Sequence, residues 1–365
     1  MATSFKRSMF KRAAISGCLV LAVLGTVLKL IAAEPDMRTL GLPEVQNQAI
    51  SITLEKIQLG RRLFFDARLS RDGKISCAAC HDPDKVFSDG LTKAKGFGGQ
   101  VGTRNTPSLL NAVFLPSQFW EGRRTTLGEQ VLDPLLNAVE HGLASRDELV
   151  QILRRDATYG QDFQAAFRAS NENISVQNVV TALVAFQTTL VAGNSPFDRY
   201  LYQGESKAMS LAAQRGLALF RSRAQCAECH HITKTYALFT DGKFHNVGVG
   251  NSAIASRLVI VALEAAKLDA ETRFKRISTD AEIAQLGRFN VTLKPEDIGA
   301  FRTQSLRNVA RTAPYMHDGS IKTLEEAVEQ EIYYRSARNG RPIILTPNEK
   351  SDLVEFLRAL DSEGK

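Results

Sequence analysis

The apolar residues of this chain recur mainly at helical spacing, and alternating strand patterns are scarce. The clearest case is residues 175–190, whose apolar positions fall three and four residues apart and predict one helix. Three helix starts are marked by Ser145, Thr323 and Thr346, each followed three residues later by Glu in a capping box. We therefore expect a mostly α fold with long loops.

Two stretches of the chain resemble each other. Gly60-Arg-Arg-Leu-Phe64 and Gly216-Leu-Ala-Leu-Phe220 each stand on a predicted helix that leads into a Cys-x-x-Cys-His motif. We interpret the two stretches as homologous units, one over residues 34–195 and one over residues 196–365. The boundary falls at the turn-forming sequence of residues 192–196.

The first 33 residues have the order of an export signal. A basic stretch from Lys6 to Arg12 precedes an apolar run over residues 13–28, and small residues end at Ala33. This order predicts a signal peptide cleaved near Ala33 and a periplasmic location for the rest of the chain. The alternative is an uncleaved membrane anchor formed by residues 13–33.

Composition excludes several classes of protein. With 365 residues, 23% of them charged and 44% hydrophobic, the chain is neither disordered nor a multi-span membrane protein. The net charge is +7, but five basic residues and no acid lie in residues 1–33, so the remainder carries only +2. Such a balance gives no reason to expect a nucleic-acid partner.

The cysteines carry the most specific chemistry. Apart from Cys18 in the leader, they form two Cys-x-x-Cys pairs, and each pair is followed at once by a histidine. This arrangement attaches haem c, because thiols at i and i+3 reach the two vinyl groups of one porphyrin and the next histidine ligates its iron. The residues concerned are Cys77, Cys80 and His81 for haem 1, and Cys226, Cys229 and His230 for haem 2.

Three other uses of paired cysteines are weaker. A zinc site does not require histidine after both pairs. A thioredoxin-like dithiol needs a βαβ context, which the hydrophobic pattern lacks. Two disulfides are the simplest alternative for an exported chain. We expect two covalently bound haem c groups.

With these motifs in place, the chain resembles the bacterial di-haem cytochrome c peroxidases and their relative MauG, the tryptophan-oxidising maturation enzyme of methylamine dehydrogenase. The likeness runs from about Leu54 to Leu360. It is carried by segments 63–70, 104–111, 119–123, 127–130, 195–200, 306–309 and 312–319, besides the two haem motifs. The resemblance implies two cytochrome c-like domains, the first with a peroxide-reacting haem and the second with an electron-transfer haem.

The resemblance also implies roles for three residues of the first unit. Trp120, the only tryptophan, matches the residue that relays electrons between the haems; without the family it would read as an ordinary core residue. Gln130 matches a residue that orients the bound oxidant, and Pro134 falls in the same pocket segment. Glu140 matches the carboxyl that moves a proton between the two peroxide oxygens; the alternative is a solvated helix end.

A calcium site is implied in the same way. Asn105, together with the backbone carbonyls of Thr312 and Pro314, matches the family's calcium site between the haems. Oxygen ligands of this kind suit a hard cation. The resemblance therefore implies one Ca²⁺ that fixes the spacing of the two haems.

The sequence departs from the family after the first haem motif. Many family peroxidases carry a histidine there, which caps the first iron until the second haem is reduced. Here no histidine lies between His81 and His141, and residues 95–102 form a glycine-rich loop, either flexible or folded over a cofactor. We expect haem 1 to be open without reductive activation, as in MauG. His141 is a weaker candidate for a replacement cap, because it adjoins Glu140 and neighbouring helical residues diverge by about 100°.

The sixth ligand of haem 2 is the second departure. The family places Met or Tyr seventeen residues after the proline of Thr-Ala-Pro-Tyr, and here that position is Glu331. Met316 and Tyr334 are the alternatives. An anionic oxygen ligand stabilises ferric iron and lowers the reduction potential relative to a thioether.

These expectations predict a di-haem peroxidase that reduces hydrogen peroxide to water with electrons from a small redox protein, cytochrome c or a cupredoxin. The alternative is a MauG-like oxidase that uses peroxide to oxidise a side chain of a partner protein; the missing cap and the absent Met favour it. A plain di-haem electron carrier is the third hypothesis, and Glu140 beside an open iron argues against it. Family members often dimerise, so a homodimer is also allowed.

Overall fold

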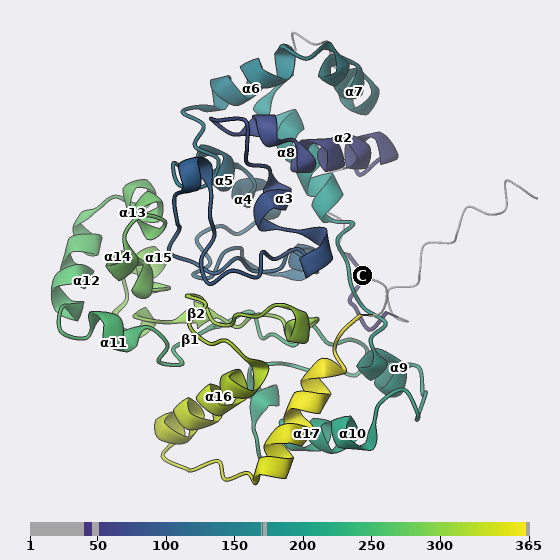
Figure 1. The fold of residues 1–365 in the computed structure, drawn as a ribbon, viewed down its shortest axis with the longest axis vertical. Coiled ribbons are helices and arrows are strands. Elements are labelled where there is room, and N and C mark those ends of the chain that lie inside the picture. Colours follow the sequence, from purple (N-terminus) through teal and green to yellow (C-terminus); the bar gives the residue numbers. More distant parts are fainter. Residues whose placement is uncertain (1–39, 46–50, 169, 171–173, 363–365) are drawn as a thin grey trace, which may run out of the picture. The chain divides into compact units, whose positions relative to one another are not determined.

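The computed structural model describes residues 40–45, 51–168, 170 and 174–362. The export signal or anchor predicted for residues 1–33 therefore lies outside the described residues. Within them the chain is mostly helical with long loops, as the hydrophobic spacing predicts (Figure 1). In this described part, no helix is both long enough and apolar enough to span a membrane.

The first half of the chain is built on a crossing of two helices, α2 (Leu54–Phe65) and α8 (Val176–Gln187). Helix α8 is the helix predicted over residues 175–190, with Ser175 as its N-cap and its end at Gln187. Gly60 lies at the crossing, where an added Cβ would come within 1.9 Å of the Ala182 carbonyl oxygen. The two backbones approach this closely because glycine has no side chain.

The second half repeats this crossing with α10 (Leu211–Arg221) and α17 (Pro347–Arg358). Gly216 lies at its centre, and an added Cβ would come within 1.9 Å of the Asp352 carbonyl oxygen. Gly60 and Gly216 are the first residues of the two similar stretches found in the sequence. Each Gly-x-x-Leu-Phe stretch thus encodes the same helix contact ahead of a cysteine motif.

The remaining elements of the two halves are short. In the first half they are η1 (Ala67–Leu69), α3 (Cys77–Cys80), η2 (Pro83–Lys85), η3 (Phe97–Gly99), η4 (Ala112–Phe114), α4 (Leu127–Gln130), α5 (Leu132–Leu136), α6 (Arg146–Arg154) and α7 (Ala157–Phe167). In the second half they are α9 (Pro196–Tyr202), η6 (Cys226–Glu228), η7 (Pro295–Asp297), η8 (Val309–Arg311) and α16 (Leu324–Asn339).

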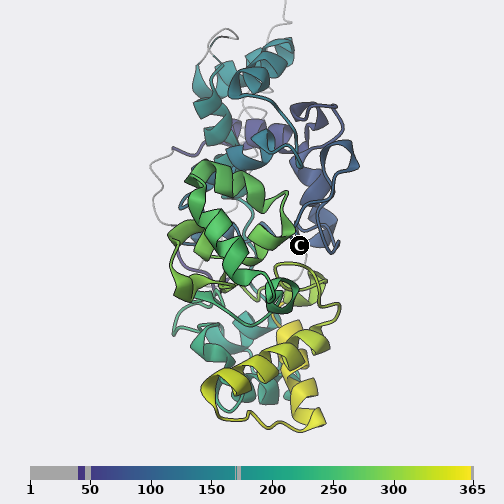
Figure 2. The ribbon, with the colours of Figure 1, turned by 90° about the vertical axis from the view of Figure 1, so that its left-hand side faces the viewer.

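A group of small helices interrupts the second half between strands β1 (Phe244–His245) and β2 (Phe301–Arg302), which pair antiparallel. Figure 2 turns these helices toward the viewer. They are α11 (Asn251–Ile254), α12 (Leu258–Lys267), α13 (Ala270–Ile277), α14 (Ala281–Gln285) and α15 (Phe289–Thr292). They enclose a small apolar cluster of their own, which includes Val261, Ile277 and Leu286.

The buried apolar residues of the two halves form two larger clusters. One runs from Leu59 to Ala192 and the other from Phe197 to Leu360. The chain passes from the first to the second through the segment that leads into α9, where Ser195 caps the helix and Pro196 is its first residue.

The three predicted helix caps are confirmed. The hydroxyl oxygens of Ser145, Thr323 and Thr346 each accept a hydrogen bond from the backbone N–H of the glutamate three residues later. In α16 and α17 the glutamate carboxylate also accepts from the backbone N–H of the cap residue, which completes a capping box. In α6 the Glu148 carboxylate accepts from the Ala144 N–H instead, so the capping box predicted at Ser145 is not formed.

Candidate haem sites and the residues around them

Both histidines of the cysteine motifs are held in the same way. His81 Nδ1 lies 3.0 Å from the Phe87 carbonyl oxygen, and His230 Nδ1 lies 2.8 Å from the Phe239 carbonyl oxygen. A carbonyl oxygen only accepts, so each Nδ1 carries the proton and each Nε2 keeps its lone pair. This tautomer is the one that a metal-ligating histidine needs.

Burial keeps these groups in their neutral forms. It lowers the pKa of His81 and lowers that of His230 to about 4. It also raises the pKa of the Cys77, Cys80 and Cys226 thiols to about 12. All four motif cysteines are free, so the disulfide alternative finds no support in the structure.

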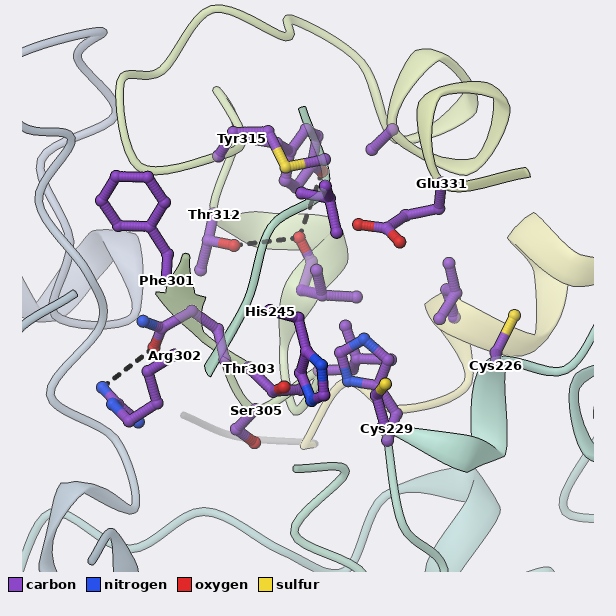
Figure 3. Close-up of a pocket in the computed structure, with 18 of the residues that line it drawn as sticks. Cys226, Cys229, His245, Phe301, Arg302, Thr303, Ser305, Thr312, Tyr315 and Glu331 are labelled. Atoms are coloured by element: carbon purple, nitrogen blue, oxygen red, sulfur yellow. Dashed lines mark hydrogen bonds between the residues drawn. The ribbon is translucent and has the colours of Figure 1, made fainter. Parts of the chain in front are cut away.

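A cavity of about 500 Å³ adjoins the second motif (Figure 3). This volume lies in the range of cofactor pockets. Its wall combines Cys226, Cys229 and His230 with residues of β2, of the loop that follows it, and of α16. The cavity is thus walled by the attachment motif on one side and by helix α16 on another.

Unpartnered polar groups in this wall suit a haem. Arg302 Nη1, Gln304 Nε2 and Arg335 Nε are buried donors that have no hydrogen-bond partner among the described residues. A porphyrin with two carboxylates would give such donors acceptors, and buried donors without acceptors are costly. Together with the free thiols and the neutral imidazole, these donors fit a covalently attached haem.

Glu331 is the unpartnered acid of the same cavity. Its carboxylate points from α16 into the space faced by Cys229 and His245 (Figure 3). It forms no hydrogen bond or ion pair with any described residue. Burial raises its pKa, and the charges of Arg335 and His245 oppose that rise. Met316 and Tyr334, the other two candidate ligands, also line this cavity.

His245 has a different environment. Its Nε2 lies 2.8 Å from Asp241 Oδ2, and the Cys229 thiol and Asp241 raise its pKa to about 9. Cys229, Asp241 and His245 are the one group of such side chains, among the described residues, placed closely enough to hold a metal ion. Because haem attachment converts the Cys229 thiol into a thioether, we assign this group to the haem 2 site rather than to a separate metal.

Glu140 lies on the side of the first motif. It adjoins His141, whose Nε2 lies 4.0 Å from Cys77 Sγ, and its negative charge raises the pKa of the Cys77 and Cys80 thiols. Burial raises its own pKa, against the positive charge of Arg123. Gln130, the last residue of α4, keeps a buried Oε1 without a partner among the described residues. Glu140 is therefore a partly buried carboxyl beside the haem 1 motif, not a solvated helix end.

His141 is also buried beside this motif. Its Nδ1 donates to the Leu69 carbonyl oxygen at 2.8 Å, and its Nε2 lies 4.0 Å from Cys77 Sγ. Burial lowers its pKa. The ring of His141 is thus anchored to the backbone and packs against the first cysteine sulfur.

The glycine-rich loop of residues 95–102 is folded over the segment that carries Glu140. The Phe97 N–H donates to the Glu140 carbonyl oxygen at 2.7 Å, and Gln100 Nε2 donates to the Ala138 carbonyl oxygen at 3.0 Å. A Cβ on Gly96 would come within 2.2 Å of the Val139 carbonyl oxygen. The loop is thus packed onto the segment that carries Glu140.

Trp120 joins elements from both halves. Its Nε1 donates to the Asn105 carbonyl oxygen at 2.9 Å, and its own carbonyl oxygen accepts from the Arg302 N–H at 2.8 Å. Its ring lies edge-on to His317, with 6.4 Å between centroids, and His317 is stacked on Phe301 at 3.7 Å. Trp120 also lines the cavity beside the second motif.

The three residues of the implied calcium site line this cavity as well. Asn105 Nδ2 donates to the Leu91 carbonyl oxygen at 2.8 Å, so its Oδ1 is the end left to accept. Thr312 and Pro314 belong to the loop between η8 and α16. The fold therefore brings together Asn105 and a loop that lies more than two hundred residues later in the sequence.

Several residues of these sites carried no sequence signal of their own. Arg302 and His245 come from two-residue strands, too short to recognise from periodicity. His317 falls in a segment that supported the family resemblance, but its stacking on Phe301 is a tertiary contact. Asn137, whose amide contacts Glu140, stands three residues before it, a spacing that hints at contact only once the local turn is known.

Comparison with known proteins points to the same chemistry. Residues 54–207 match the family described as di-haem cytochrome c peroxidase. The chain is 35% identical over 323 residues to the methylamine utilization protein MauG of Methylorubrum extorquens, covering 87% of this chain and 81% of that protein. It is 34% identical over 321 residues to the cytochrome c551 peroxidase of Pseudomonas aeruginosa, covering 88% and 82%.

A solved structure agrees with these sequence matches. It is the crystal structure of a MauG-like protein associated with microbial copper homeostasis, with a TM-score of 0.71 and 34% identity. The match covers 88% of this chain and 95% of that one. The similarity therefore extends over both halves of the fold.

Proposed function

This chain belongs to the di-haem cytochrome c peroxidase family, and from that premise we propose that it reduces hydrogen peroxide to water with electrons from a small redox protein. Membership makes it a di-haem oxidoreductase, since its relatives are named both peroxidases and MauG. The observation that carries the proposal is Glu140, a partly buried carboxyl beside the first attachment motif, next to His141, which contacts Cys77. An electron carrier has no use for a proton-transfer group there.

The chain would hold its two cofactors through the attachment motifs. Cys77 and Cys80 would bind the first porphyrin and His81 its iron. Cys226 and Cys229 would bind the second, with His230 on its iron and Glu331 as the proposed sixth ligand. When bound, the haems supply the redox chemistry of peroxide reduction.

The side chains around haem 1 would handle the proton. Reduction of H₂O₂ to two molecules of water consumes two electrons and two protons. Glu140 would accept a proton from the peroxide oxygen nearer the iron and return it to the farther oxygen, so that the farther oxygen leaves as water. Gln130, whose Oε1 is without a partner, would orient the oxidant. Trp120 would pass electrons between the two haem groups.

The test is the reaction of the ferric holoprotein with peroxide, followed by stopped-flow absorption. Glu140→Gln should slow the spectral change about 10²- to 10⁴-fold, the usual contribution of a general acid–base group. Reduced cytochrome c, offered afterwards, should be oxidised rapidly by the wild type. A Glu140→Gln variant as fast as wild type would exclude the proposed proton transfer.

One observation favours the MauG-like alternative, oxidation of a side chain on a partner protein. The loop of residues 95–102 contains no histidine and is packed onto the pocket segment through Phe97 and Gln100. A haem 1 that reacted with peroxide without prior reduction of haem 2 would suit an enzyme that keeps its oxidising equivalents for a protein substrate. Fast reaction with peroxide combined with poor turnover of cytochrome c and of a cupredoxin would establish this alternative.

We also propose the remaining features that the sequence implies. Asn105 Oδ1 and the carbonyls of Thr312 and Pro314 would bind one Ca²⁺. The two halves, residues 34–195 and 196–365, would each be a cytochrome c-like domain. The order of the first 33 residues supports export to the periplasm. A homodimer is proposed only because members of the family often dimerise.

A further inference from the structure

Glu140 is held by a side chain to which nothing above assigns a role. We propose that Asn137 is a positioning residue, which engages one carboxyl oxygen of Glu140 and leaves the other, Oε2, to handle the peroxide proton. The inference rests on the proposed function of Glu140 and deepens it. It names the residue that decides which oxygen of the carboxyl works.

The orientation of the Asn137 amide is fixed by the backbone. Asn137 ends helix α5, and its Oδ1 accepts from the Val139 N–H at 2.9 Å. A backbone N–H can only donate, so this end of the amide is the oxygen and the opposite end is the NH₂ group. Asn137 Nδ2 therefore donates to Glu140 Oε1, at 2.6 Å.

This contact makes the two carboxyl oxygens unequal. The oxygen that receives the amide N–H cannot carry a proton directed at the same nitrogen. When Glu140 is ionised, Oε2 is therefore the oxygen free to accept a proton, and when it is neutral, Oε2 carries that proton. The orientation of the carboxyl, and the oxygen that exchanges the proton, are thus fixed before any substrate binds. Proton transfer requires this preorganisation.

The backbone of this segment is held without the Asn137 side chain. The Asn137 carbonyl oxygen accepts from the N–H groups of Glu140 at 3.1 Å and Gly142 at 2.8 Å. The Phe97 N–H holds the Glu140 carbonyl oxygen from the glycine-rich loop. Loss of the Asn137 amide should therefore release the carboxyl while leaving the turn in place.

Other groups also act on the Glu140 carboxyl. Arg123 lowers its pKa, and Asp133 of α5 raises it. Cys77 and Cys80 of α3 face it as thiols, which become uncharged thioethers when haem is attached. The Asn137 hydrogen bond lowers the pKa, so removing it should move the pKa upward. Ser278 Oγ, from the end of α13, lies 3.3 Å from Asn137 Oδ1 on the far side of the amide.

The experiment uses the holoprotein with both haems. Asn137→Asp keeps an oxygen acceptor for the Val139 N–H but replaces the donor to Glu140 by a second acid. Infrared difference spectra across pH give the titration midpoint of the Glu140 carboxyl, identified as the C=O band that Glu140→Gln removes. We expect the midpoint to rise by about one pH unit or more, because donor loss and like charge act in the same direction.

The peroxide reaction gives the second readout. We expect the rate at pH 7 to fall about tenfold in Asn137→Asp, and the pH–rate profile to move to higher pH. In a Glu140→Gln background the same substitution should change the rate less than twofold, because the group it positions is gone. Ser278→Ala, which leaves the Asn137–Glu140 contact intact, is the matched control and should behave as wild type.

Two results distinguish a failure of the Asn137 positioning role from a failure of the proposed function. If Glu140→Gln is slow but Asn137→Asp leaves both the midpoint and the rate unchanged, the positioning role is wrong and the proposed function stands. If Glu140→Gln itself is as fast as wild type, the proposed function fails. Should Asn137→Asp fail to incorporate haem, Asn137→Ser gives the same test, since its hydroxyl can cap the Val139 N–H but is too short to reach Glu140.

Discussion

The cavity beside the second motif is distinguished by one carboxylate. Glu331 stands where the family places a Met or Tyr ligand, and it is partly buried without a hydrogen-bonding partner among the described residues. An unpaired buried acid is expensive unless it meets a cation. Ferric iron would be such a cation, which is why we expect an oxygen ligand and a low potential for haem 2.

Substitution of Glu331 by Met tests this ligand. The variant should raise the reduction potential of haem 2 and introduce a sulfur-to-iron charge-transfer band in the near infrared, because a thioether favours ferrous iron. A shift of about 59 mV corresponds to a tenfold change in the one-electron equilibrium, and we expect at least that. Met316→Leu and Tyr334→Phe are the controls and should leave spectrum and potential unchanged. A sulfur band already present in the wild type would exclude Glu331.

Single residues also mark the limit of sequence reasoning. The attachment cysteines and histidines were recognisable because the chemistry fixes their spacing to five consecutive positions. Asn137, by contrast, contacts Glu140 through a turn whose geometry depends on the Phe97 and Gly142 hydrogen bonds. No spacing rule for asparagine predicts such a contact.

At the scale of elements, the two helix crossings show how a short motif specifies packing. Gly60 and Gly216 each face a backbone carbonyl of the partner helix at a distance that no side chain fits. The Leu and Phe residues that follow are buried in the two main apolar clusters. The glycine therefore allows the close distance between the two helices, and the buried Leu and Phe hold the helix in the apolar cluster.

Gly216→Ala should destabilise the second half. The new Cβ would overlap the Asp352 carbonyl oxygen, so the helices must separate, and we expect a loss of about 3 kcal/mol or more in the free energy of unfolding. Gly128→Ala in α4 is the matched control, because its Cβ would meet Val180 Cγ1 at 3.5 Å and Thr126 Oγ1 at 3.9 Å, both ordinary van der Waals contacts. Chemical denaturation of the holoprotein compares the two. Equal midpoints would mean that the crossing tolerates a side chain.

The packing of the glycine-rich loop, unlike that of the helix crossings, is not marked by a motif in the sequence. Its composition fits both a flexible loop and one that covers a cofactor, and the sequence leaves the choice open. The structure shows where the loop packs: Gly96 contacts the Val139 carbonyl, and two hydrogen bonds join the loop to residues 138–140. Those partners lie some forty residues further along the chain, beyond the reach of local pattern.

At the scale of the whole molecule, Trp120 lies where the two halves meet. It connects Asn105 of the first half with Arg302 and His317 of the second through two hydrogen bonds and a ring contact. The proposed calcium residues line the same cavity. Electron transfer between the haems and the geometry of their separation would thus depend on one shared cluster.

Trp120→Phe tests this coupling. The substitution keeps a smaller aromatic ring, but the hydrogen bond from Nε1 to the Asn105 carbonyl is lost. The phenylalanine ring is also far harder to oxidise than indole. We expect steady-state turnover to fall about tenfold, equivalent to about 1.4 kcal/mol of barrier. Reduction of haem 2 by the external donor, followed by its own absorption change, should keep its wild-type rate. A slower reduction of haem 2 would instead indicate a structural defect.

The sequence by itself determined the local chemistry of this protein: two haem-attachment motifs, the helix caps, and the repeated Gly-x-x-Leu-Phe stretch ahead of each motif. These features are written in consecutive residues, because each depends on covalent geometry or on one helical turn. The tertiary structure decided how the two helix crossings pack and what surrounds the motifs, including the Glu331 carboxylate, the folded glycine-rich loop, the Asn137–Glu140 contact and the Trp120 cluster. These features join residues that are brought together only by packing, and packing depends on the whole chain at once.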